Sequence, residues 1–269
     1  TNVLFVLALV VVCVAGWAGP AQAAITWNVA GSGAWDATTA NWAPGPTTFT
    51  DDGTVDVIFG NTAGGTITIA AGMSPLSTTV SAASGTYTFN GGPIDSGTLT
   101  KSGGGTLRLN NSNTYTGKTT ILGGTLRINS FDTLGLPTDA NAIIDMYGGS
   151  TLRVSTTTTS QTTDRTINLA GGTGTATIRV NDNDRVFTFG AVTTSGVAPI
   201  TLSLLTGSEG NGDRAALTFT GALSETDDAP LSLNVTFRTQ TASLSYVSLK
   251  EGGTFTGPSS STYDVNFNE

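Results

Sequence analysis

A four-residue element recurs along the middle of the chain and restricts what the chain can fold into. Its copies read Thr-Leu-Arg-Leu, Thr-Leu-Arg-Ile, Thr-Leu-Arg-Val and Thr-Ile-Arg-Val, at residues 106–109, 125–128, 151–154 and 177–180. The second position of each copy is Leu107, Leu126, Leu152 and Ile178, so the first step along the chain is shorter than the two equal steps that follow. Units that repeat at such spacing cannot bury an apolar face alone and stack on their neighbours. The spacing therefore predicts a solenoid.

Each copy also alternates between apolar and polar residues. Because successive side chains of a strand point to opposite faces, one face carries an apolar column and the other a row of arginines. The column consists of Leu107, Leu126, Leu152 and Ile178, extended by Leu109, Ile128, Val154 and Val180. The arginines are Arg108, Arg127, Arg153 and Arg179. We predict an all-β fold, a right-handed parallel β-helix (β-solenoid), with the apolar column inside.

A tandem of β-sandwich domains is the competing fold, because closely spaced turns are typical of it as well. Such domains repeat only about every 100 residues. The element at 106–109 recurs already at 125–128, and this short spacing favours the solenoid.

The overall composition excludes several classes of function. Only 11% of the residues are charged, the net charge is −8, and histidine is absent. A chain so poor in lysine and arginine is not expected to bind nucleic acid. Without histidine it cannot form a Ser-His-Asp triad or a histidine metal site. We expect no cofactor, no metal site and no catalytic residues.

The N-terminal segment has the features of a leader. Residues 3–14 are an uninterrupted apolar run, and Ala21-Gln22-Ala23 supplies an A-x-A cleavage site. A transmembrane anchor is the alternative, but the run is too short to span a bilayer comfortably. We predict a signal peptide at 1–23 that lacks its basic start, with export through the Sec pathway. Removal of the peptide would remove Cys13, the only cysteine.

The rest of the chain divides into two expected parts. Residues 24–50 carry three tryptophans and are predicted to form an N-terminal cap, and residues 51–269 are predicted to form the β-helix repeats. The chain starts without Met and stops after an alternating stretch, so we expect a fragment truncated at both ends. Any membrane attachment would then use an anchor outside this fragment.

Residues 96–130 also resemble a known family. They contain Ser-Gly-Thr-Leu-Thr-Lys-Ser-Gly-Gly-Gly-Thr-Leu-Arg-Leu, then Asn-Thr-Tyr-Thr-Gly-Lys-Thr-Thr, then Gly-Gly-Thr-Leu-Arg-Ile. This segment is similar to the autotransporter-associated β-strand repeat, found in secreted passenger regions of bacterial surface proteins. The resemblance implies a non-enzymatic passenger, a stalk or adhesin, that is secreted or displayed at the bacterial cell surface beyond the outer membrane.

The arginine row is the first candidate binding site. A row of guanidinium groups could bind the carboxylates of surface glycans or of a host or matrix polysaccharide. The alternative is a solvated face whose arginines discourage edge association. Stacked arginines repel one another and need carboxylates or an anionic ligand nearby. Asp132, Asp145 and Asp182 are expected in the same turns of the solenoid.

Trp27, Trp35 and Trp42 form the second candidate. They could provide a platform on which a sugar stacks, which would make the chain a carbohydrate-binding adhesin. They could equally pack over the first turn and close the core, and the family resemblance favours this cap.

An enzyme, a β-helix polysaccharide lyase or hydrolase, is the alternative function. It requires carboxylates that converge from neighbouring turns. The acidic clusters of the sequence stand beside Gly, Asn or Thr and are therefore typical of turns: Asp51 and Asp52, Asp182 and Asp184, Asp213, and Asp227 and Asp228. The segment 181–185, Asn-Asp-Asn-Asp-Arg, is the best local candidate for a weak Ca²⁺ site, and a turn is the favoured interpretation.

Overall fold

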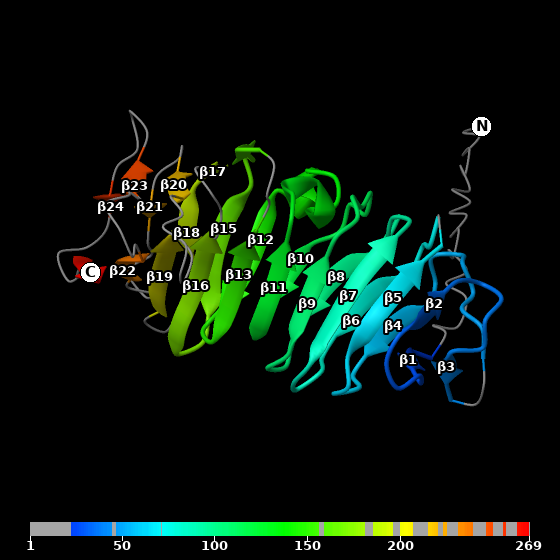
Figure 1. The fold of residues 1–269 in the computed structure, drawn as a ribbon. Helices are drawn as coiled ribbons and strands as arrows, with labels where there is room; N and C mark the ends of the chain where they lie inside the picture. Colours follow the sequence, from blue (N-terminus) through cyan, green and yellow to red (C-terminus); the bar gives the residue numbers. More distant parts are fainter. Residues whose placement is uncertain are drawn as a thin grey trace, which may run out of the picture.

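A computed structural model shows an all-β solenoid built from mostly parallel strands (Figure 1). The structure describes residues 23–44, 47–70, 72–155, 159–180, 185–195, 200–206, 215–219, 223–224, 231–238, 246–249, 255–256 and 263–268. The predicted all-β solenoid is confirmed. The predicted signal peptide lies almost wholly outside the described residues, and the boundaries of the expected parts stay a prediction.

The strands of the solenoid form three sheets, and the chain passes from one sheet to the next within each turn. The third sheet begins only at β14 (Gln161–Thr162). The first sheet contains β1 (Ile25–Trp27), β3 (Trp42–Ala43), β4 (Asp56–Phe59), β6 (Ser77–Val80), β8 (Thr98–Lys101), β10 (Thr119–Ile121), β12 (Ile143–Tyr147), β15 (Thr166–Gly171), β18 (Val192–Thr194), β21 (Leu223–Ser224) and β24 (Phe255–Thr256). The second contains β2 (Gly33–Trp35), β5 (Gly65–Ile69), β7 (Thr86–Gly91), β9 (Thr106–Leu109), β11 (Gly124–Ile128), β13 (Ser150–Val154), β16 (Gly174–Val180), β19 (Ile200–Thr206), β22 (Leu231–Arg238) and β25 (Tyr263–Asn268). The third contains β14 (Gln161–Thr162), β17 (Arg185–Phe189), β20 (Ala215–Phe219) and β23 (Tyr246–Leu249).

The strands of the second sheet stack in the register that the repeat predicts. Leu126 of β11 pairs with Leu107 of β9 on one side and with Leu152 of β13 on the other. Leu152 in turn pairs with Ile178 of β16. All four side chains of this column are fully buried. The apolar column is therefore the core of the solenoid, as the alternation predicts.

The longer steps of the repeat have two different structural causes. The turn between β9 and β11 contains only β10. The turn between β11 and β13 adds two 3₁₀ helices, η1 (Phe131–Leu134) and η2 (Asp139–Asn141). The turn between β13 and β16 adds β14, the first strand of the third sheet. The solenoid thus absorbs the extra residues outside the second sheet, and the register of that sheet is kept.

The core changes character along the axis. At the N-terminal end it is aromatic: the Trp27 and Trp42 rings lie 5.2 Å apart, and Trp35 lies 5.5 Å from Phe59. β1 pairs with β3 in antiparallel fashion and with β4 in parallel, so β3 covers the first parallel strand of that sheet. Further along, the second sheet contributes the aliphatic column of Leu107, Leu126, Leu152 and Ile178. An aromatic cluster at the end of a solenoid supplies a large buried area where the aliphatic column begins.

Tight corners between the sheets depend on glycine, and Gly124 provides a test. Its φ is +63°, and an added Cβ would lie 2.4 Å from the carbonyl oxygens of Gly103 and Gly105 in the preceding turn. We expect Gly124→Ala to lower the free energy of unfolding by about 3 kcal/mol, because left-handed strain and backbone overlap add. Gly149→Ala is the matched control, since Gly149 has φ +85° but nothing within 4 Å. Denaturant unfolding followed by circular dichroism compares them, and equal losses would contradict this account of the corner.

Candidate functional site

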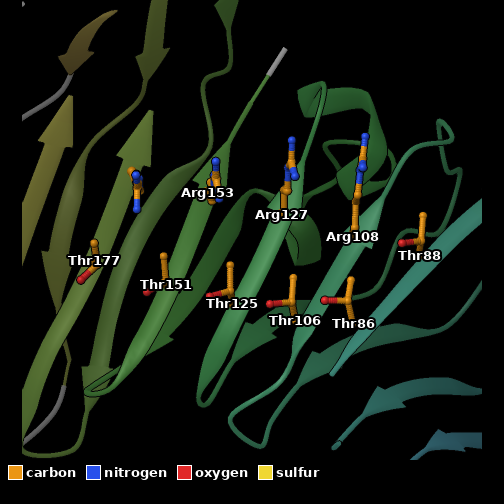
Figure 2. A pocket seen from close by; sticks show the side chains of 10 residues that line it. Thr86, Thr88, Thr106, Arg108, Thr125, Arg127, Thr151, Arg153 and Thr177 are labelled. Carbon is orange, nitrogen blue, oxygen red and sulfur yellow. The ribbon is translucent and has the colours of Figure 1, made fainter. Parts of the chain in front are cut away.

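The predicted arginine row lines a groove on the outward face of the second sheet. It has a volume of about 450 Å³ and is lined only by threonines and arginines: Thr86, Thr88, Thr106, Arg108, Thr125, Arg127, Thr151, Arg153, Thr177 and Arg179. Figure 2 shows two lines of side chains. Thr86, Thr106, Thr125, Thr151 and Thr177 form one line, and Thr88, Arg108, Arg127 and Arg153 lie in a second line beside it. The structure therefore brings all four arginines of the predicted row into one groove, which we call the arginine groove.

Strand pairing sets the geometry of the arginine groove. Arg127 is in register with Arg108 and Arg153, and Arg153 is in register with Arg179. Neighbouring strands lie about 4.8 Å apart, so the four arginines repeat at about this spacing. Two residues earlier, Thr106, Thr125, Thr151 and Thr177 stack in the same way.

Neutral side chains hold the guanidinium groups at the edge of the arginine groove. Arg108 Nε donates to Asn110 Oδ1 at 2.8 Å, and Arg127 Nη2 donates to Ser155 Oγ at 3.1 Å. Asn110 is itself fixed, because its Nδ2 donates to Asn90 Oδ1 at 2.7 Å. These bonds orient the guanidinium groups of Arg108 and Arg127.

Two of the three aspartates that were expected in the same turns as the arginines are described, and both lie outside the second sheet. Asp145 is on β12 in the first sheet, where its Oδ2 is 2.5 Å from Lys118 Nζ and its Oδ1 accepts from Asn168 Nδ2. Asp132 is exposed in η1, where its charge acts on Arg165. Asp132 and Asp145 therefore share a turn with the arginines, as expected, but they lie outside the second sheet because residues of one turn are divided among different elements. Asp182 lies outside the described residues.

Of the candidate acidic clusters, the structure describes only the first, which consists of Asp51 and Asp52. Side-chain and backbone hydrogen bonds from Thr54 lower the pKa of the exposed Asp52, and Asp51 Oδ1 accepts from the Ser74 backbone N–H. Both aspartates thus serve turns. The segment 181–184 and Asp213, Asp227 and Asp228 lie outside the described residues. Within the described part of the chain, no group of three or more His, Cys, Asp or Glu could hold a metal ion.

The three tryptophans of the N-terminal segment face inward. Trp35 and Trp42 are fully buried, and Trp27 is 2% exposed. Trp35 contacts Trp42, Phe49, Phe59 and Phe89, with ring centroids between 5.5 and 6.2 Å apart. A sugar needs an exposed ring face on which to stack, whereas these tryptophan rings are buried against other aromatic rings.

A buried lysine, not anticipated from the sequence, lies at the corner that joins β8 to the second sheet. Lys101 is fully buried, and its Nζ donates to the carbonyl oxygens of Ser102, of Gly103 at 2.9 Å and of Gly123 at 3.2 Å. Its ammonium group therefore ties together the corners of two successive turns. The signal was present: alternation in Thr98-Leu99-Thr100-Lys101 puts Lys101 on the same face as Leu99.

Burial of Lys101 makes stability depend on pH. Desolvation lowers the pKa of Lys101 from 10.5 to about 8. Below about pH 8 both the folded and the unfolded chain bind the proton, and between pH 8 and 10.5 mainly the unfolded chain binds it. We therefore expect the free energy of unfolding to rise with pH in this window, relative to Lys101→Met. Denaturant unfolding of both proteins across the window measures the difference, in which shared tyrosine titrations cancel, and a flat difference would contradict the lowered pKa.

A second buried polar network holds η1 and η2 against the core. Tyr115 Oη lies 2.9 Å from Thr119 Oγ1, which donates to Asn141 Oδ1 at 3.1 Å. Asn141 Nδ2 donates to the carbonyl of Leu134 at 2.6 Å. Arg165, 2% exposed, donates to the carbonyls of Gly135 at 2.7 Å and Asn141 at 3.2 Å. These groups satisfy the backbone of an excursion that has no strand partners.

The neighbouring corner uses two buried asparagines. Asn113 Oδ1 accepts from the Ile94 backbone N–H at 2.9 Å, and its Nδ2 donates to the Thr133 carbonyl at 2.6 Å. Asn111 Nδ2 donates to the Gly92 carbonyl at 2.6 Å. One asparagine pair thus connects three successive turns. The conspicuous Asn-x-Asn-Thr-Tyr stretch of the sequence is therefore architectural.

Comparison with known proteins gives two findings. Residues 99–128 match the passenger-associated-transport-repeat family. A segment of 133 residues is 33% identical to the adhesin BmaC autotransporter of Brucella suis biovar 1 (strain 1330). That segment covers 39% of this chain and 4% of the adhesin. No solved structure matches.

Among the described residues, no helix is both long enough and apolar enough to cross a bilayer.

The match at 99–128 falls on β8 to β11, a segment that contains Lys101, the asparagine pair and part of the arginine groove. It confirms the resemblance found at 96–130. The chain therefore contains a passenger-associated transport repeat and is similar over part of its length to an autotransporter adhesin.

Proposed function

We propose that this chain is a non-enzymatic structural passenger, a stiff stalk or adhesin displayed beyond the outer membrane after Sec-dependent export. The observation that carries the proposal is the unbroken parallel register of the second sheet from β5 to β25. Each turn contacts its neighbours through backbone hydrogen bonds and the buried column, so the array resists bending and can hold a distal element away from a surface. The likeness to an autotransporter adhesin supports the same role.

The placement of polar groups supports a non-enzymatic role. The buried polar side chains of the corners, Lys101, Asn111, Asn113, Asn141 and Arg165, are all engaged in hydrogen bonds to backbone carbonyls. Groups with such partners hold structure. A lyase or hydrolase needs a carboxylate within hydrogen-bond reach of its substrate, and the arginine groove is lined by none.

The proposal is tested by two measurements on the full chain. Incubation with a panel of acidic and neutral polysaccharides should release neither reducing ends nor unsaturated uronate ends above the level of a heat-denatured sample. Antibody labelling of intact cells that express the chain within its natural protein should detect it outside the outer membrane. Turnover of any polysaccharide would overturn the non-enzymatic role, and labelling that requires cell lysis would overturn surface display.

A further inference from the structure

We infer that the arginine groove binds a linear polysaccharide that carries carboxylate or sulfate groups at regular intervals. This inference names the partner of the proposed adhesin and rests on that function. The groove follows the solenoid axis across β7, β9, β11, β13 and β16 (Figure 2). A linear ligand can therefore lie along it and meet the same side chains once per turn.

Charge is the first argument. The outward side chains of β7, β9, β11, β13 and β16 are threonine, asparagine and arginine, with no acidic residue among them. Four guanidinium groups stand in this stripe, although the whole chain has a net charge of −8. Guanidinium groups bind carboxylate and sulfate oxygens in a bidentate manner, so a row of them matches a polymer that carries such groups at intervals.

The neutral groups beside the arginines are the second argument. The line of threonines presents hydroxyl groups on one side of the arginines, and Asn90 and Asn110 present amides on the other. Hydroxyl groups and amides both donate and accept hydrogen bonds, as the hydroxyl groups of a sugar do. A charged line with hydroxyl groups along one side, and amides beside it at the β7 and β9 end, thus matches a polymer whose anionic groups alternate with hydroxyl groups.

Other polyanions fit less well. A single-stranded nucleic acid is bound through aromatic side chains on which its bases stack, and the arginine groove is lined by threonine and arginine alone. An acidic peptide would anchor its apolar side chains in pockets, and the lining supplies no apolar residue. The chemistry of the lining therefore selects an anionic glycan.

Four immobilised probes test the inference on the full chain: a heparin oligosaccharide, an oligogalacturonate, neutral dextran, and single-stranded DNA with the charge of the heparin probe. We expect binding to at least one of the two anionic glycans, with an affinity that falls as salt is added, and no binding to dextran. Binding to neither glycan, or to DNA as tightly as to the better glycan, would overturn the inference.

Matched double variants locate the interaction. Arg108→Gln with Arg127→Gln should weaken glycan binding at least tenfold. Lys118→Gln with Arg185→Gln removes the same charge outside the groove and should leave the affinity within about twofold. Arg108→Lys with Arg127→Lys keeps the charge without the planar fork and should fall between wild type and the glutamine double. Equal losses in the two glutamine doubles, or equal affinities of the lysine and glutamine doubles in the groove, would overturn the inference.

Failure of glycan binding and failure of the proposed passenger function give different experimental results. If the groove does not bind glycans, the chain can still be found at the cell surface and remain inert toward polysaccharides. If the chain hydrolyses or eliminates a glycan, the non-enzymatic role fails even where the arginine doubles behave as expected. Melting temperatures within a few degrees of wild type are required of every variant, so that a lost fold is not counted as lost binding.

Discussion

Leu126→Asp is expected to abolish the stacked structure around β11. Leu126 is fully buried and lies between Leu107 and Leu152 in the apolar column. A carboxylate at this position would lose its hydration and gain no partner, at an effective cost of several kcal/mol. A typical domain is stable by only about 5 to 15 kcal/mol. Hydrogen exchange should therefore show that the amides of β9, β11 and β13 lose their protection.

Thr125→Asp is the matched control for this prediction. Thr125 is the preceding residue and points outward into the arginine groove. The same carboxylate is solvated there and lies beside arginines, so the loss of stability should stay near about 1 kcal/mol, the range of β-propensity. Similar losses at positions 125 and 126 would mean that the alternation does not separate an inside from an outside.

Lys101→Glu is expected to produce the second large loss, about 3 to 5 kcal/mol in the free energy of unfolding, because it leaves an uncompensated buried charge. The side chain would bring a carboxylate toward the carbonyl oxygens of Ser102, Gly103 and Gly123, which now accept hydrogen bonds from the ammonium group. Repulsion would replace attraction at a corner shared by two turns. Denaturant unfolding at pH 7 measures the change.

Lys101→Gln separates charge from size at the same corner. Its amide can still donate hydrogen bonds to the carbonyl oxygens, so it should lose clearly less stability than Lys101→Glu. A glutamine variant as unstable as the glutamate variant would show that the reach of the lysine side chain, and not its positive charge, holds the corner.

Much of the solenoid could be predicted from the sequence because stacking repeats the same local pattern. The strand register follows from Leu107, Leu126, Leu152 and Ile178, since each turn must align its apolar residues with those of the turn before. The arginine row follows from the same register by alternation. A fold in which every turn contacts only its neighbours leaves few long-range arrangements open.

The corners could not be predicted in the same way. Alternation places Lys101 on the inward face, but charged residues are almost never fully buried unless they have partners. The partners of Lys101 and Arg165 are backbone carbonyls, which carry no sequence signal. The excursion at η1 and η2 and the third sheet that begins at β14 lengthen their turns by the same amount, so spacing alone does not distinguish them. Spacing along the chain places Asp132 and Asp145 in the same turn as the arginines, but it does not show that they lie outside the second sheet.

The stacked register is tested most directly by distances between spin labels on the outward threonine line. Pairs that join Thr86 to Thr151, Thr177 and Ser203 span three, four and five strand steps of the second sheet. In a Cys13→Ser background, double electron–electron resonance should give separations that grow by about 4.8 Å per step, to about 24 Å for the longest pair. Separations that do not increase regularly from Thr151 to Ser203 would contradict a parallel solenoid and, with it, a continuous arginine groove.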